Sequence, residues 1–232
     1  MKMKLLKSIG LASLLAIVPG LRAEIIYNNS TTDTTFRLMA TNNQQIGDQI
    51  IMAGTARFLT NFSLEYYSPN LGFSGSVYAD VAFYLNNGTL FNGYASPNAT
   101  PFFDTGFQHI SPPSAYTTPA TNVGVLNFDL RNDPQSQLVL PTNFTLVVTF
   151  QGLVGPADQV GVALFNPVTV GQNTPDYWLN NGTGWQLLTN SATPVNFGAR
   201  FDATVPEPSV IGLSLLGGIA ALATARRRKG RN

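Results

Sequence analysis

Apolar and polar residues alternate with a period of two along most of the chain between residues 24 and 205. In residues 144–150, for example, Phe, Leu, Val and Phe occupy every second position. Successive side chains of a β-strand point to opposite faces, so this period is that of strands with one buried face. No stretch outside the two ends of the chain sustains a helical period. The pattern therefore predicts a domain built from strands.

Clusters of Pro, Asn, Ser and Asp interrupt the alternation at residues 68–70, 111–114 and 132–134. These residue types favour turns and the edges of sheets. About ten short strands separated by such breaks predict an all-β fold, specifically an antiparallel two-sheet sandwich of jelly-roll type. Residues 92–121 are rich in Pro, Ser and Thr and are expected to form a long loop.

Two segments share one pattern, in which an aromatic residue and Leu precede Asn-Asn-Gly-Thr and a second aromatic residue follows. They are residues 84–91 and 178–185. Asn-Gly favours the type I′ turn that closes a two-residue hairpin. Both segments are therefore predicted to be β-hairpins.

The central part of the chain is acidic and contains no cysteine. Residues 24–205 hold four arginines, no lysine and eleven carboxylates, a net charge of −7. Such a body offers no basic surface to a phosphate backbone, so nucleic-acid binding is not expected. The absence of cysteine excludes disulfides, thiol nucleophiles and thiolate metal sites. A core of ordinary size must hold the fold together, and a chain that is 44% hydrophobic can supply one.

The first 23 residues have the layout of a secretory signal peptide. Lys2, Lys4 and Lys7 precede an apolar run over residues 8–18, and a short exit segment ends at Ala23. We expect cleavage after Ala23. The alternative is a retained N-terminal anchor helix, although the apolar run is short for a membrane span.

The C-terminal end has three parts: Pro206, Glu207 and Pro208, then an apolar run over residues 210–225, then the basic residues Arg226, Arg227, Arg228, Lys229 and Arg231. A helix over the apolar run would be about 24 Å long, and snorkelling arginines could extend it towards the roughly 30 Å of a hydrocarbon core. The basic cluster should stay in the cytoplasm. Residues 24–205 would then lie on the opposite side of the membrane.

This tripartite tail resembles the PEP-CTERM sorting signal of exported bacterial proteins. The resemblance rests on Pro206, Glu207 and Pro208, the apolar span and the Arg226–Lys229 cluster. It implies a signal peptide (1–23), an ectodomain (24–204) and a sorting tail (205–232). It also implies an exosortase as a partner, which cuts near Pro-Glu-Pro, and a final location at the cell surface or in the extracellular matrix. Such proteins usually occur in bacteria that make exopolysaccharide.

The sequence contains no convincing catalytic constellation. His109 is the only histidine, and no nucleophile elbow accompanies it, so we interpret it as a loop residue. Apart from Glu24 at the expected new N-terminus, Glu65 is the only Glu in the body. Its place in an alternating strand predicts a solvent-facing side chain rather than half of a glycosidase pair. Asp48 is predicted to be a turn or strand-end carboxylate. We therefore expect no enzyme, cofactor or transition-metal site.

Two binding chemistries remain open as alternatives. The first is structural calcium, for which turn aspartates are the candidate ligands, although solvated turn residues are the favoured interpretation. The second is a carbohydrate-stacking platform beside the second predicted hairpin, although burial in the core is favoured for large aromatic residues. The candidate calcium ligands are Asp129, Asp133, Asp158 and Asp176, and the candidate platform consists of Tyr177, Trp178 and Trp185.

The sequence thus predicts an exported protein of the cell surface or extracellular matrix with a structural or interaction role. The alternative is a carbohydrate-binding module that recognises exopolysaccharide.

Overall fold

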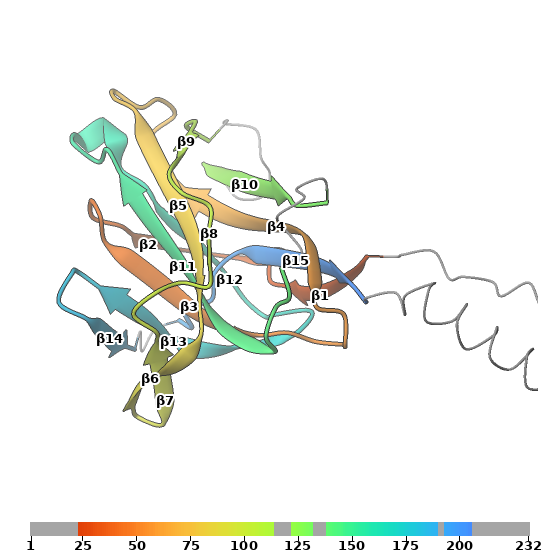
Figure 1. Ribbon diagram of the computed structural model, residues 1–232. Helices are drawn as coiled ribbons and strands as arrows, with labels where there is room; N and C mark the ends of the chain where they lie inside the picture. The colour runs from red at the N-terminus through yellow and green to blue at the C-terminus, as the bar shows by residue number, and fades with distance from the viewer. Residues whose placement is uncertain (1–22, 114–121, 132–137, 190–192, 206–232) are drawn as a thin grey trace, which may run out of the picture.

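The computed structural model of the protein describes residues 23–113, 122–131, 138–189 and 193–205 (Figure 1). These residues form an all-β fold in which every paired strand is antiparallel, as predicted. The strands are β1 (Glu24–Asn28), β2 (Asp33–Met39), β3 (Gln45–Ile51), β4 (Phe58–Tyr67), β5 (Val77–Tyr84), β6 (Asn86–Phe91), β7 (Tyr94–Pro97), β8 (Phe103–Asp104), β9 (Gln108–Ile110), β10 (Val123–Asp129), β11 (Asn143–Gln151), β12 (Gly161–Phe165), β13 (Gln172–Asn180), β14 (Trp185–Leu188) and β15 (Ala199–Thr204).

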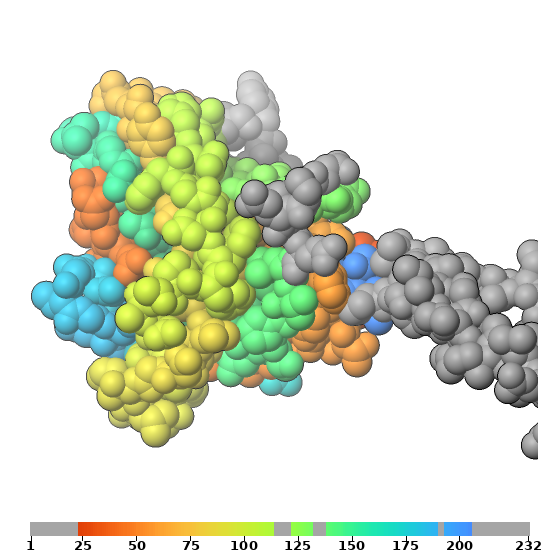
Figure 2. Space-filling model, viewed as in Figure 1, coloured from red at the N-terminus to blue at the C-terminus, as the bar shows by residue number. Residues whose placement is uncertain are grey.

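The strands form two large sheets and one small one. The first sheet has the order β1-β15-β4-β12-β2, with β10 also paired to β4. The second sheet has the order β14-β13-β3-β11-β5-β8, with β9 also paired to β5. Strands β6 and β7 pair only with each other, and this hairpin projects from the body (Figures 1 and 2).

The two large sheets share one hydrophobic core. Phe62 of the first sheet stacks on Phe128 and Phe201, with ring centroids 4.4 and 5.6 Å apart. It also contacts Phe83 of the second sheet edge-on at 5.0 Å. The inward residues of β11 have the predicted period, because Phe144, Leu146, Val148 and Phe150 all belong to this core. Burial on facing sheets makes the fold sandwich-like.

Of the two predicted hairpins, only the second has its turn where the sequence placed it. Strands β13 and β14 pair from Asn180 opposite Trp185, so the loop is residues 181–184, four residues rather than the two that an Asn-Gly type I′ turn would give. In the first segment Asn87 and Gly88 lie inside β6, and the turn falls at the next Asn-Gly, Asn92–Gly93. Both residues of that turn have positive φ, at 49° and 87°, the backbone geometry that a two-residue hairpin requires.

The loop predicted over residues 92–121 is also partly incorrect. Its described part contains β7, β8 and β9, and the last two cover the free edge of β5. Figure 2 shows residues 85–113, in yellow to green, lying across the front of the molecule. Strands of two and three residues are too short to show alternation, so only pairing with β5 defines them.

The two ends of the described body lie side by side. Glu24 at the start of β1 pairs with Ala203 near the end of β15. The chain therefore enters and leaves at one end of the sandwich, at the right in Figure 1. The β2–β3 and β11–β12 connections lie at the opposite end, which we call the distal pole.

Candidate functional site

The structure places Trp178 and Trp185 on one face of the β13–β14 pair and Tyr177 on the opposite face. Tyr177 and Trp178 are neighbours in β13 and therefore point to opposite faces of the second sheet. Tyr177 packs against the main core. Trp178 is 0% exposed, and Phe91 of the β6–β7 hairpin contacts it edge-on at 5.7 Å. In this structure a buried indole has no face available to a sugar ring.

Gly47 allows Trp178 to pack closely against the neighbouring strand β3. Trp178 is directly opposite Gly47 of β3. A Cβ atom at position 47 would lie 2.7 Å from Thr145 and 3.3 Å from the Cβ of Trp178. Glycine is therefore needed here for close packing. Trp178 is a buried residue on the outer face of the second sheet, the face that points away from the main core.

Trp185 is the member of the predicted platform that is partly exposed on the outer face of the second sheet. Its ring contacts Tyr84 edge-on at 5.6 Å, and its indole N–H donates to the carbonyl oxygen of Asn98 at 3.3 Å. It packs over a small cluster that contains Ala82 and Val147. Trp185 thus has a fixed orientation, which is the property that a stacking residue requires.

A row of side chains crosses the outer face and ends at Trp185, and we call it the polar row. The register places its members directly opposite one another on β5, β11, β3, β13 and β14: Asp80, Thr149, Gln45, Asn180 and Trp185. Asn180 Nδ2 donates to Gln45 Oε1 at 2.8 Å, and Gln45 Nε2 donates to the Tyr84 hydroxyl at 3.1 Å. These hydrogen bonds satisfy much of the row internally.

The acidic end of the polar row is protonated more readily than an ordinary aspartate. Burial, together with hydrogen bonding and charge from Asp104, raises the pKa of Asp80 to about 6. The Thr105 hydroxyl donates to Asp80 at 3.2 Å and partly offsets this effect. Above pH 6 this end is increasingly negative and would repel anionic ligands.

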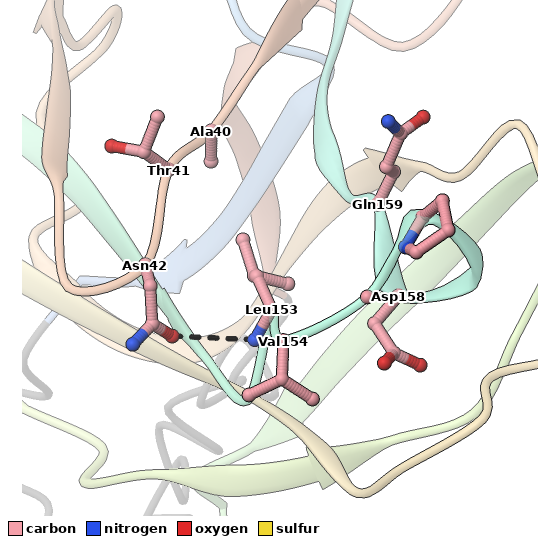
Figure 3. Close-up of a pocket in the computed structure, with 9 residues that line it drawn as sticks. Ala40, Thr41, Asn42, Leu153, Val154, Asp158 and Gln159 are labelled. Atoms are coloured by element: carbon pink, nitrogen blue, oxygen red, sulfur yellow. Dashed lines mark hydrogen bonds between the residues drawn. The ribbon is translucent and has the colours of Figure 1, made fainter.

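A second candidate site lies at the distal pole, where the sequence analysis singled out only Asp158, as a possible calcium ligand. A pocket of about 370 Å³ opens between the β2–β3 connection and the segment that follows β11 (Figure 3). We call it the pole pocket, and its lining consists of Ala40, Thr41, Asn42, Leu153, Val154, Gly155, Pro156, Asp158 and Gln159. Its volume lies within the range of small-molecule sites.

Asp158 holds one wall of the pole pocket in place. Its carboxylate is buried and accepts hydrogen bonds from the Ser74 N–H (2.7 Å), the Ser74 hydroxyl (2.7 Å) and the Gly75 N–H (3.1 Å). The hydroxyl bond, with the backbone bonds, lowers the pKa of Asp158 below its usual value. Asn70 also donates to the carbonyl oxygens of Pro156 and Ala157. The β4–β5 and β11–β12 connections are therefore tied together.

The four carboxylates proposed as calcium ligands are not gathered into one site in the described part of the chain. Asp158 is occupied by Ser74 and Gly75, Asp129 pairs with Arg131, and Asp133 lies outside the described residues. Asp176 is a partly buried residue of the irregular part of β13. Within the described part of the chain, no three His, Asp or Glu side chains are grouped closely enough to hold a metal ion.

Two other residues differ from their predictions, Glu65 in its exposure to solvent and His109 in its secondary structure. Glu65 is half-buried rather than solvent-facing, and burial, with the charge of Asp33, raises its pKa to about 7 although Arg37 opposes the effect. His109 is exposed as expected, but it lies in strand β9 rather than in a loop, with Tyr78 edge-on at 5.6 Å.

Asp48 departs furthest from its prediction. It lies in the middle of β3, is 0% exposed, and accepts a 2.8 Å hydrogen bond from the backbone N–H of Phe197. Burial raises its pKa well above 3.8, although that hydrogen bond opposes the shift. Its Oδ1 has no hydrogen-bond partner, and neither do the buried Tyr27 hydroxyl and Asn173 Nδ2. A strand pattern cannot reveal such a carboxyl, because Asp48 occupies an inward position that apolar residues normally fill.

The residues of the proposed sorting tail, Pro206, Glu207, Pro208 and Arg226–Lys229, lie outside the described residues, as does most of the proposed signal peptide. Within the described ranges, no helix has the length and apolar character needed to cross a membrane.

No known family model, curated protein or solved structure matches this chain. Function must therefore be inferred from the chain's own residues and geometry.

Proposed function

We propose that this protein is an exported β-sandwich of jelly-roll type that acts as an interaction or structural component of the cell surface or extracellular matrix. In this proposal residues 1–23 direct export, and an exosortase recognises the tail at Pro206, Glu207 and Pro208. The span over residues 210–225 then holds the protein in the membrane until it is processed.

The observation that best supports this proposal is the position of the two ends of the body. Because β1 and β15 pair, both terminal segments join the sandwich at one end. A tail attached there would present the distal pole, with its loops and pocket, away from the membrane (Figure 1). Loops held on a rigid sheet scaffold are a common location for binding surfaces.

Changing Pro206, Glu207 and Pro208 together to alanine tests the role of the tail. We expect export to continue while full-length protein accumulates in the inner membrane, because the protease loses its recognition segment. Deleting residues 226–229 should instead allow the tail to pass through the membrane, because the basic cluster fixes its orientation. Mass spectrometry of the mature surface form provides the measurement. A mature species that still ends at Asn232 would show that the tail is only an anchor.

A second candidate function is exopolysaccharide binding at the outer face of the second sheet. This function is favoured by the ring of Trp185, which is partly exposed, has a fixed orientation and lies at one end of the polar row. We expect the Trp185→Ala variant to lose retention on exopolysaccharide from the source organism, because a sugar ring would lose its stacking surface. Affinity electrophoresis measures the retention.

Phe36→Ala is the matched control for that experiment, because Phe36 is also an exposed aromatic residue but belongs to the first sheet. Its retention should equal that of the wild type. Equal retention of the wild type and the Trp185→Ala variant would exclude Trp185 as a stacking residue.

A further inference from the structure

The pole pocket combines fixed walls with polar groups that the fold does not use. Asn42 Oδ1 accepts from the Leu153 N–H at 3.2 Å, and Ala40 N–H donates to the carbonyl of Val160 at 3.0 Å. With the Asp158 bonds to Ser74 and Gly75, these contacts hold both sides of the pocket. Its shape therefore exists before any ligand arrives, which reduces the entropic cost of binding.

Three polar side chains of the pocket remain available. The Thr41 hydroxyl, Asn42 Nδ2 and the Gln159 amide have no hydrogen-bond partner among the described residues. Beside them, Leu153, Val154 and Pro156 form an aliphatic wall, and Val154 is 81% exposed. Of the three, only Asn42 is held by a hydrogen bond, and the exposed Thr41 and Gln159 side chains are free to turn towards a ligand. Amide and hydroxyl groups next to an apolar surface are a common composition of ligand sites.

The charge of the lining narrows the ligand class. Asp158 is the one charged residue in the lining, and its carboxylate is engaged by Ser74 and Gly75. No arginine or lysine lines the pocket, and the body is strongly acidic. Anionic ligands are therefore disfavoured, and the pocket offers no unpaired carboxylate to a cation.

The backbone of the pocket argues against an extended peptide. Peptides that add to a sheet edge need unpaired backbone groups. Here the N–H groups of Ala40, Leu153, Val154 and Asp158 already donate to acceptors within the protein. These four N–H groups are not available to a peptide backbone. The side-chain amide and hydroxyl groups of the lining both donate and accept, as ligand hydroxyls do.

We propose that the pole pocket binds an uncharged, hydroxyl-rich ligand, namely a unit of a neutral saccharide. Its hydroxyls would bond to Thr41, Asn42 and Gln159, and its C–H face would lie on Leu153, Val154 and Pro156. This site is separate from the outer face that carries Trp185, and it does not depend on the processing of the tail.

Titration calorimetry of the full chain in a non-glycosidic detergent tests this proposal. The probes are tetramers of N-acetylglucosamine, glucose and galactose, a galacturonate tetramer, and a neutral acetylated tetrapeptide. We expect at least one neutral saccharide to bind, and neither the galacturonate tetramer nor the peptide to bind as well. No binding by any neutral saccharide, or tighter binding of the galacturonate or the peptide, would overturn the proposal.

Substitutions of lining residues test whether the saccharide binds in the pole pocket. Asn42→Asp keeps the oxygen that accepts from Leu153 but removes the free N–H donors, and Gln159→Ala removes an exposed amide. Each should weaken saccharide binding about tenfold with an unchanged melting temperature, the order expected for a lost hydrogen bond. Gln186→Ala, which removes an exposed amide on β14, should bind like the wild type. Unchanged affinity in both pocket variants, or a loss confined to Trp185→Ala, would place the binding elsewhere.

Discussion

Replacing Trp178 by alanine is expected to lower the free energy of unfolding by about 3–5 kcal/mol, the usual cost of removing a large buried aromatic side chain. Trp178 is fully buried between Gly47 of the sheet and Phe91 of the projecting hairpin. The variant would contain a cavity that the paired strands beneath it cannot close. Urea denaturation of the full chain, followed by tryptophan fluorescence or circular dichroism, measures the loss.

Trp185→Ala serves as the comparison, because the ring of Trp185 is partly exposed and loses less apolar contact. It should destabilise the protein clearly less than Trp178→Ala. Equal losses in the two variants would show that both rings are structural, and the case for Trp185 as a binding residue would then be lost.

The second large effect concerns Asp48 and pH. Because its pKa is raised, the carboxyl stays neutral in the folded protein at pH values where the unfolded chain, with an ordinary pKa near 4, is already ionised. Folding must then take up a proton. The stability linked to Asp48 is complete below its unfolded pKa and declines by about 1.4 kcal/mol per pH unit as the pH rises towards its folded pKa.

Asp48→Asn removes this titration and keeps an oxygen that can accept from the Phe197 N–H. Its amide nitrogen occupies the place of Asp48 Oδ1, which has no hydrogen-bond partner, so the substitution breaks no hydrogen bond. We expect the variant to gain stability over the wild type as pH increases from 5 to 8.

Urea unfolding of both proteins at several pH values measures this difference. Asp80 and Glu65 also have raised pKa values, but they are present in both proteins, so their contributions cancel in the difference. Parallel stability curves for the two proteins would show that Asp48 is not neutral in the fold. A variant that is less stable at every pH would show that the carboxyl makes bonds that an amide cannot replace.

The sequence alone determined the all-β class and the inward face of the regular strands. In β11 the alternation identified the core side chains directly, because the two-residue period of a strand is a local property. The existence of the β13–β14 hairpin was predictable because Asn and Gly favour a chain reversal locally, although its loop has four residues rather than two. The first Asn-Gly was assigned wrongly because two such pairs lie close together, and pairing along β6 and β7 selected the second.

Only the tertiary structure decided what the carboxylates and aromatic residues do. The hydrogen-bond partner of Asp48 is 149 residues away along the chain, and the Ser74 that engages Asp158 is 84 residues away. Trp178 is buried because a distant hairpin covers it. Alternation specifies which side of a strand a residue occupies, but the partner on that side comes from elements brought together by folding. The burial of Asp48, the burial of Trp178 next to the partly exposed Trp185, and the pole pocket therefore have no local signature.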